Sequence, residues 1–221
     1  MKVELIRYTA EPEDLCGEAA AICTDYHDHG KALRGALSSG HESVIEHASF
    51  TFRVEGVSRA LLAQITRHRL ASFSVQSQRY VDMSAMPYVV PPSIDENYEL
   101  LEAYTDLMER IKGFYRMAVD EGIPAEDARF ALPNACCTQF VMTMNARELK
   151  HFLWLRTCNR AQWEIRALAD EMLRECVKAA PGLFKKAGCA CMQNKPCPEG
   201  KRSCGRPRAS QEVLSGGKDT D

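Results

Sequence analysis

The chain has 221 residues, of which 45% are hydrophobic, and this is enough to bury a sizeable core in one compact domain. Its 28 Lys and Arg residues oppose 30 Asp and Glu residues, so the net charge of −2 gives no general positive field for nonspecific binding to nucleic acid. No segment resembles a signal peptide or approaches the roughly 18 apolar residues of a membrane span. We therefore expect a soluble, cytoplasmic protein in which anion binding is local.

The N-terminal part of the chain predicts short strands that alternate with helices. Val3 and Leu5 indicate an opening strand, and alanine and leucine at helical spacing indicate helices over 14–26 and 31–37. Residues 49–55 alternate apolar and polar side chains, which is typical of a half-buried strand. We expect that strand to end at Gly56.

Longer helices are predicted in the remainder. Ser58 is a candidate cap for a helix over 60–69, and a capping box at 93–96 predicts the start of a long helix that ends at Gly122. We expect the buried face of that long helix to be formed by Leu100, Tyr104, Leu107, Met108, Ile111 and Tyr115. Residues 136–144 alternate again, and Asn145 is expected to cap a helix of about 30 residues. The pattern predicts an α+β domain with a small antiparallel or mixed sheet against long helices.

From about residue 185 the composition changes to Lys, Arg, Gly, Pro and Cys without apolar periodicity. We expect one domain over 1–185 and a cysteine-rich basic tail over 186–221, with the last dozen residues disordered. The tail cysteines could bind zinc, form disulfides or remain thiols, because their spacing lacks the paired CxxC of common zinc sites. They are Cys189, Cys191, Cys197 and Cys204. The other six cysteines are expected to be reduced core residues: Cys16, Cys23, Cys136, Cys137, Cys158 and Cys176.

The segment 67–80, RHRLASFSVQSQRY, concentrates three arginines, one histidine and three serines. On a helix end, Arg67 and Arg69 would point about 200° apart and could not serve one ligand from one face. If the following chain is extended, Ser77 and Arg79 share a side and could hold one phosphate. A helix C-terminus also favours cations without any ligand, so a purely structural role stays open.

Arg156 lies within the apolar run HFLWLR and is therefore expected to point inward, whereas a solvated face would account for Glu164 and Arg166. A buried guanidinium needs a partner, because an unpaired buried charge costs several kcal/mol. No carboxylate lies within a helical turn of Arg156 in the sequence. A bound ligand is a candidate partner.

Four ordered motifs resemble those of flavin-dependent thymidylate synthases. They are RHR with Ser77 and Arg79, HESVIEHASFTF (41–52), ARFALP (128–133) and NARELKHFLWLRTCNRAQWEI (145–165), and together they cover about residues 1–185. The resemblance implies an enzyme that methylates dUMP to dTMP, with 5,10-methylenetetrahydrofolate as carbon donor and NADPH as reductant through FAD. It also implies a homotetramer with active sites shared between subunits. From the charge, the hydropathy and the residue spacing we expect no nucleic-acid partner, no membrane binding and no metal in the active site.

Roles follow from the resemblance position by position. The implied FAD contacts are Ser43, Arg67, His68, Arg69, Asn145, Arg147 and His151. The implied dUMP contacts are Gln64, Arg67, Ser77, Gln78, Arg79, Arg129 and Arg156. Arg156 is the implied catalytic residue, which polarises the uracil ring. An arginine can stabilise negative charge on a uracil oxygen but cannot act as a base at neutral pH.

The chain departs from the family pattern at four positions. Ser43 replaces a threonine and keeps its hydroxyl, and His151 replaces an asparagine and can still form hydrogen bonds. Val75 stands where several relatives carry glutamate, and because its side chain cannot form hydrogen bonds it is not a site residue. Arg160 occupies a position where histidine is common and has no assigned role.

Three other functions are weighed against this one. The basic motif and tail could form an RNA-binding module, and the flavoprotein could act on another nucleotide. A zinc site at His41 and His47 is disfavoured, because these residues are six apart and zincin histidines are four apart.

Overall fold

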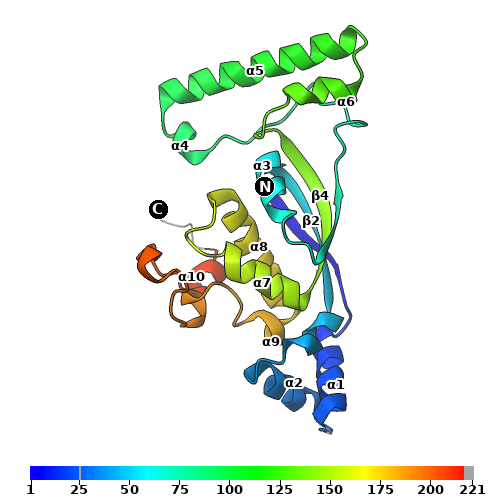
Figure 1. Cartoon of the computed structure of the whole chain (residues 1–221), viewed down its shortest axis with the longest axis vertical. Coiled ribbons are helices and arrows are strands. Elements are labelled where there is room, and N and C mark those ends of the chain that lie inside the picture. The colour runs from blue at the N-terminus through cyan, green and yellow to red at the C-terminus, as the bar shows by residue number, and fades with distance from the viewer. Residues whose placement is uncertain (25, 217–221) are drawn as a thin grey trace. The chain divides into compact units, whose positions relative to one another are not determined.

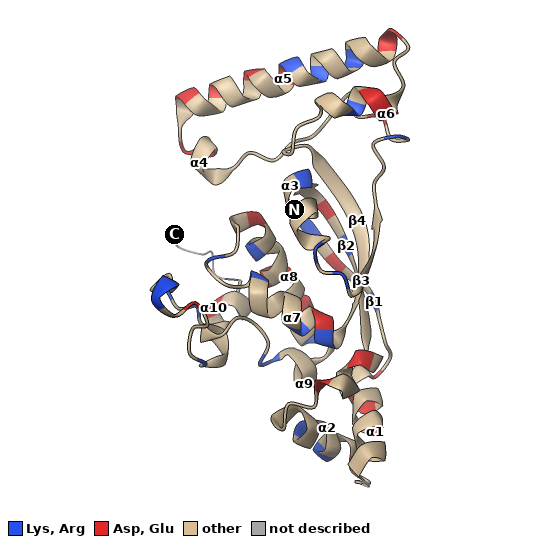
Figure 2. Ribbon diagram, viewed as in Figure 1, with Lys and Arg blue, Asp and Glu red and all other residues tan. Residues whose placement is uncertain are grey.

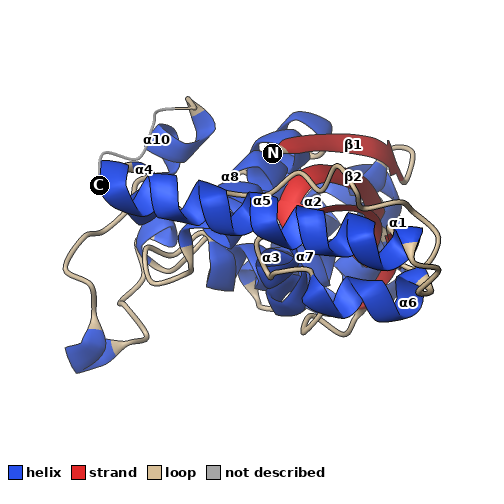
Figure 3. Ribbon diagram, turned by 90° about the horizontal axis from the view of Figure 1, so that it is seen from above, coloured by secondary structure: helices blue, strands red, loops and turns tan. Residues whose placement is uncertain are grey.

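The computed structural model describes residues 1–24 and 26–216. It combines helices with one four-stranded antiparallel sheet (Figure 1). The strands are ordered β1-β2-β4-β3 in the sheet. Their bounds are Lys2–Tyr8 for β1, Ser49–Ser58 for β2, Ala71–Val75 for β3 and Cys137–Asn145 for β4. Figure 3 shows these strands in red among the more numerous helices in blue. The predicted α+β class is confirmed.

Alternating apolar residues predicted β2 and β4 correctly. Phe50, Phe52 and Val54 are fully buried along one face of β2, as the half-buried pattern requires. The predicted end at Gly56 is wrong, because the strand passes through this glycine, whose φ is 69°, and continues to Ser58. Glycine tolerates this left-handed backbone without a steric penalty.

The chain divides into two compact units. Unit 1 comprises Met1–Lys2, Val54–Arg67 and Ser74–Phe140, and unit 2 comprises Val3–Arg53, His68–Phe73 and Val141–Asp221. All four strands have residues in both units.

Unit 1 contains five helical elements. They are α3 (Arg59–Ile65), α4 (Pro92–Asp95), α5 (Tyr98–Asp120), α6 (Ala125–Ala128) and the 3-10 helix η2 (Arg129–Ala131). Ser58 caps α3 as predicted, since its hydroxyl accepts the Leu61 N–H at 3.0 Å. Helix α3 ends at Ile65, so the prediction that Arg67 and Arg69 lie on the helix is wrong. The capping box at 93–96 is also wrong, because Asn97 is the cap of α5.

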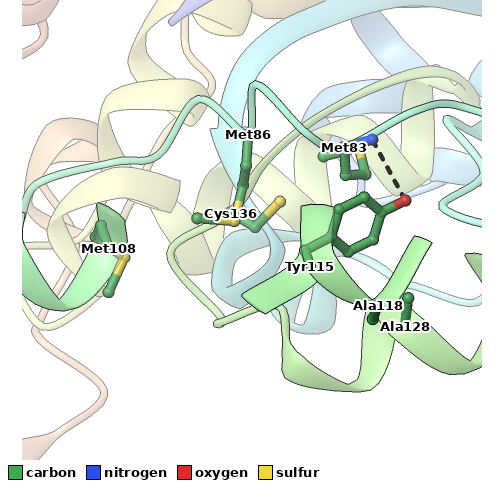
Figure 4. Packing of buried hydrophobic residues seen from close by; sticks show 7 residues of the cluster. All are labelled: Met83, Met86, Met108, Tyr115, Ala118, Ala128 and Cys136. Carbon is green, nitrogen blue, oxygen red and sulfur yellow. Dashed lines mark hydrogen bonds between the residues drawn. The ribbon is translucent and has the colours of Figure 1, made fainter. Parts of the chain in front are cut away.

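A hydrophobic cluster packs one side of α5 (Figure 4). Its buried members are Met83, Met86, Met108, Tyr115, Ala118, Ala128 and Cys136. Tyr104 and Ile111 pack against the cluster, as the helical pattern predicted. Leu100 and Leu107 do not belong to the buried face, since they are 54% and 47% exposed. With Phe114, also half exposed, they repeat every seven residues and form a separate apolar stripe.

Unit 2 contains the remaining helices, in the parts of the chain that the structure describes. They are α1 (Pro12–Thr24), α2 (His29–Ser38), η1 (Glu42–His47), α7 (Ala146–Arg156), α8 (Trp163–Ala179), α9 (Pro181–Phe184), η3 (Cys191–Gln193), η4 (Gly200–Arg202) and α10 (Ser210–Leu214). The predicted single helix after Asn145 is wrong. Helix α7 ends at Arg156, and Gln162 caps α8 by accepting the N–H groups of Glu164 and Ile165. The break places Arg156 at a helix end.

The C-terminal segment has more structure than its composition indicates. Within 186–216 the chain forms η3, η4 and α10, and Cys189, Met192 and Val213 are buried. The boundary at residue 185 and the disorder of the tail stay predictions, and residues 217–221 lie outside the described residues.

The cysteines are unpaired thiols. The prediction that six of them are core residues is confirmed at Cys16, Cys136 and Cys176 and wrong at Cys23, which is exposed, while Cys137 and Cys158 are only partly buried. In the described ranges, no cluster of three or more His, Cys, Asp or Glu side chains is arranged to hold a metal ion. Over those same residues, no helix combines the length and the apolar character needed to cross a bilayer.

Candidate active site

Unit 2 contains a cleft of about 1610 Å³ lined by residues of α2, η1, α7 and the segment from 181 to 195. This volume exceeds the roughly 300–1,000 Å³ of pockets for drug-sized ligands, so a dinucleotide fits. Asn145, Arg147 and His151 line it, and all three belong to the predicted FAD set. Basic side chains from α2 and from the segment after α9 line it as well, and Figure 2 shows the Lys and Arg positions in blue.

Two acidic residues of η1 bind the first turns of α7. Glu46 accepts a hydrogen bond from Arg147, and Glu42 accepts one from Lys150 at 2.6 Å. The hydrogen bond to Glu46 raises the pKa of the Arg147 guanidinium. Asn145 begins this region as the predicted cap, since its side chain accepts the Glu148 N–H at 2.9 Å. These contacts position the cleft-facing side of α7.

The other predicted FAD contacts of unit 2 are Ser43, His68 and Arg69. Ser43 and Arg69 are exposed, and their neighbours Glu42 and Leu70 line the cleft. His68 is instead 5% exposed and has its ring against α7. Whether these three residues contact FAD stays a prediction.

His68 lies between Glu148 and Arg156. Its Nδ1 is 3.0 Å from Glu148 Oε1, and Arg156 Nε donates to its Nε2 at 3.2 Å. Because a guanidinium nitrogen can only donate, Nε2 must accept, and the ring proton must be on Nδ1 facing the carboxylate. Burial lowers the pKa of His68, although the hydrogen bond to Glu148 opposes this shift. The ring is therefore neutral at neutral pH.

The sequence argument that left Arg156 without a protein partner is wrong, because His68 is that partner. Glu164 and Arg166, which the sequence placed on a solvated face, are both buried. Arg160 is exposed and pairs with Glu199 at 3.4 Å.

The C-terminal segment binds the residue that follows Arg156. Thr157 is fully buried, its hydroxyl accepts the Cys189 N–H at 2.8 Å, and its carbonyl accepts from Arg208 at 2.7 Å. Arg208 also donates two hydrogen bonds to the Asp170 carboxylate, at 3.0 and 2.8 Å. The end of α7 is thus held by α8 and by residues near the C-terminus.

Unit 1 contains most of the predicted dUMP contacts. The Ser77 hydroxyl accepts the Arg79 N–H at 3.2 Å in a turn after β3, so the extended geometry assumed for these residues is wrong. Arg79 pairs with Glu126 at 2.9 Å, and Arg129 donates to the Glu126 carbonyl at 3.1 Å. Both side chains of the Arg79 pair are half exposed, so an incoming anion can reach the guanidinium.

The last three predicted dUMP contacts in unit 1 differ in their exposure. Gln78 is buried, with its amide 3.6 Å from the Cys136 sulfur. Gln64 is partly buried and Arg67 is exposed. Their contact with dUMP stays a prediction.

Comparisons with known proteins identify the family. Residues 4–182 match the family model described as thymidylate synthase complementing protein. A protein of Geobacter sulfurreducens named flavin-dependent thymidylate synthase is 47% identical over 220 residues, which cover 93% of this chain and 94% of that relative. A protein of the same name from Clostridium tetani is 42% identical, and the match covers 96% of each chain. Another from Pyrococcus furiosus is 40% identical, and the match covers 90% of each chain.

The chain belongs to the flavin-dependent thymidylate synthase family. It is an enzyme of the methyltransferase type.

The sequence did not indicate four acidic residues and one arginine that contact the candidate site residues or the end of α7. Glu148 was recognised only as the residue three positions after a helix cap, which gives no sign of its contact with His68. The others are Glu42, Glu46, Glu126 and Arg208. Their partners lie far away in the sequence, so spacing alone carried no signal for them.

Proposed function

We propose that this enzyme converts dUMP to dTMP, with 5,10-methylenetetrahydrofolate as carbon donor and NADPH as reductant, by way of bound FAD. The observation that carries the proposal is the position of Arg156 at the end of α7. There its guanidinium donates a hydrogen bond to the buried His68. The same helix presents Arg147 and His151 to a cleft large enough for a dinucleotide. The relatives are named flavin-dependent thymidylate synthases, which supports the flavin and the thymidylate product of this proposal.

The cleft fits a phosphate-bearing cofactor in both charge and size. Besides Arg147, its cations include Lys31, Arg34 and Lys195. Asn145, Arg147 and His151 would hold FAD from α7, and Ser43, Arg67, His68 and Arg69 complete the proposed set. When bound, the flavin supplies the hydride that the methylation requires. The chain's own residues bind the reactants, orient them and stabilise charge.

The proposed role of Arg79 and Arg129 is to bind the dUMP phosphate. A guanidinium keeps its charge at any physiological pH and matches phosphate oxygens with two parallel donors. The Glu126 carboxylate that now pairs with Arg79 is itself an oxygen anion, so a phosphate can replace it. Ser77, Gln78, Gln64 and Arg67 complete the proposed dUMP set together with Arg156.

Arg156 is proposed to stabilise the negative charge that develops on a uracil oxygen. A donor fixed before reaction in a site with little water is worth roughly 10²- to 10³-fold in rate. Ser77 is not a nucleophile in this scheme, because its hydroxyl hydrogen-bonds a backbone N–H and, within the described residues, no base is positioned to activate it.

Assembly into a homotetramer with shared active sites is part of the proposal. Helix α5 exposes an apolar stripe that includes Leu100, Leu107 and Phe114. An apolar stripe of this kind is typical of a surface covered by another chain. A second copy of this chain is the proposed partner.

The test is formation of dTMP by the purified protein. The protein is saturated with FAD and incubated with dUMP, methylenetetrahydrofolate and NADPH, and each component is omitted in turn. We expect dTMP only in the complete mixture. FAD uptake without dTMP would favour a flavoprotein that acts on another nucleotide, and RNA affinity that falls steeply with salt, without FAD uptake, would favour the RNA-binding module.

A further inference from the structure

The buried carboxylate of Glu148 is linked to the proposed catalytic arginine, Arg156, through the side chain of His68. Glu148 and His68 are 8% and 5% exposed, and their side chains are 3.0 Å apart. His68 is in turn 3.2 Å from Arg156. A capping-box glutamate would bind back to the residue that caps its helix, whereas this carboxylate reaches a histidine 80 positions away.

We infer that Glu148 is a positioning residue for the reaction: by fixing His68 as the Nδ1–H tautomer, it makes His68 Nε2 the acceptor that orients the Arg156 guanidinium. This inference rests on the proposed role of Arg156.

The direction of each hydrogen bond supports the inference. The carboxylate can only accept and the Arg156 Nε–H can only donate, so the imidazole between them has one permitted arrangement. Rotating the ring or moving its proton to Nε2 would place donor against donor at Arg156. Because Nε is bonded directly to the guanidinium carbon, fixing Nε sets the plane in which the two terminal nitrogens lie.

Acid should disrupt this arrangement. Protonated His68 would carry a proton on Nε2, lose its acceptor and repel Arg156. The titratable or charged groups around the ring are Glu148, Arg156 and His151, all on α7, and the Phe152 ring packs at 5.1 Å. The Glu148 charge opposes the lowering of the His68 pKa by burial. Removing that charge should lower this pKa further and move the acid limb of the activity profile to lower pH.

The test compares Glu148→Gln with Glu148→Ala in the FAD-loaded enzyme. Gln keeps an oxygen that accepts the Nδ1 proton but removes the charge, so we expect a small loss in kcat and an acid limb at lower pH. Ala removes the acceptor, and we expect kcat to fall roughly 10- to 100-fold, by analogy with the loss found when the orienting partner of a metal-binding histidine is removed. Because Glu148 lines the cleft and His68 belongs to the proposed FAD set, FAD content is measured for each variant and kcat is compared at full FAD loading. The KM for dUMP should change much less than kcat. Glu175→Gln, which removes a partly buried carboxylate paired with the exposed Lys178, is the matched control.

A second measurement does not depend on turnover. In enzyme labelled with ¹⁵N-histidine, the His68 resonances, assigned by their loss in His68→Gln, should show the proton on Nδ1. Glu148→Ala should abolish that preference. A proton on Nε2 in the wild-type enzyme would overturn the inference.

The kcat values of Glu148→Ala and Arg156→Ala distinguish the positioning role of Glu148 from the proposed role of Arg156. Wild-type kcat in Glu148→Ala, with Arg156→Ala inactive, would overturn the positioning role and leave the proposed function intact. Wild-type kcat in Arg156→Ala would overturn the role of Arg156 and the positioning role that depends on it, and the ¹⁵N spectrum would then report only a structural contact.

Discussion

The guanidinium groups of Arg156 and Arg79 have opposite surroundings. Arg156 contacts a buried imidazole, and the next residue, Thr157, is fully buried and bound by Arg208. Arg79 pairs with Glu126 in a contact where both side chains are half exposed. The chain thus fixes the first group by itself and leaves the second open to an anion. The difference corresponds to the proposed roles, since a charge-stabilising donor benefits from rigidity and a phosphate-binding residue must exchange partners.

The largest expected effect on stability is at the C-terminal contact of the Arg156 region. Arg208→Ala leaves the buried Asp170 carboxylate without its bidentate partner, and breaking a buried pair costs about 3–5 kcal/mol in the free energy of unfolding. Arg160→Ala is the control, because it removes an exposed pair with Glu199, worth about 1 kcal/mol or less, and one hydrogen bond to the Arg202 carbonyl, worth roughly 0.5–1.5 kcal/mol. Urea denaturation measures both. Equal small losses would show that the C-terminal segment does not stabilise the end of α7.

The next largest effect concerns catalysis. Arg156→Ala should lower turnover roughly 10²- to 10³-fold while FAD stays bound, because the proposed role is charge stabilisation and not cofactor binding. Steady-state kinetics and the flavin absorbance of the purified variant measure the two quantities. Near wild-type turnover would remove Arg156 from the catalytic machinery.

A smaller effect is expected in the open region. Arg79→Ala should weaken dUMP binding by roughly 10- to 100-fold, which corresponds to the loss of a hydrogen bond to a charged group worth about 1.5–3 kcal/mol. Deoxyuridine, which lacks the phosphate, serves as the matched ligand and should bind both proteins equally. Equal weakening of both ligands would mean that Arg79 does not bind the phosphate.

The smallest effect is expected at the carboxylate that pairs with Arg79. Glu126→Gln should change the free energy of unfolding by about 1 kcal/mol or less, because the pair is half exposed. dUMP affinity should stay the same or rise, since the variant removes an anion that competes for the guanidinium. Calorimetric titration with dUMP tests this, and a clear loss of affinity would show that Glu126 assists nucleotide binding.

Local features of the structure could be predicted from the sequence, whereas contacts between distant segments could not. Ser58 and Asn145 cap helices as expected, because a cap depends on residues three positions apart. The break between α7 and α8 escaped prediction because the run from 145 to 165 contains neither glycine nor proline. Tertiary contacts of Thr157 and the cap at Gln162 accompany that break.

In the proposed site, too, local motifs could be predicted from the sequence and contacts between distant residues could not. Its arginines could be recognised from short motifs, but the pairing of His68 with Glu148 joins residues 80 positions apart. No periodicity encodes such a contact, and the sequence therefore suggested that Arg156 needed a ligand as partner. The folded chain provides that partner itself.

The most direct test of the proposed activity is a single-turnover experiment without oxygen. FAD-loaded enzyme is reduced with NADPH, and dUMP and methylenetetrahydrofolate are then added singly and together while flavin absorbance and dTMP are recorded. We expect the oxidised flavin spectrum to return only when both are present, with dTMP formed in proportion to the flavin. A flavin that stays reduced in the complete mixture, or dTMP formed without flavin oxidation, would contradict the proposed function.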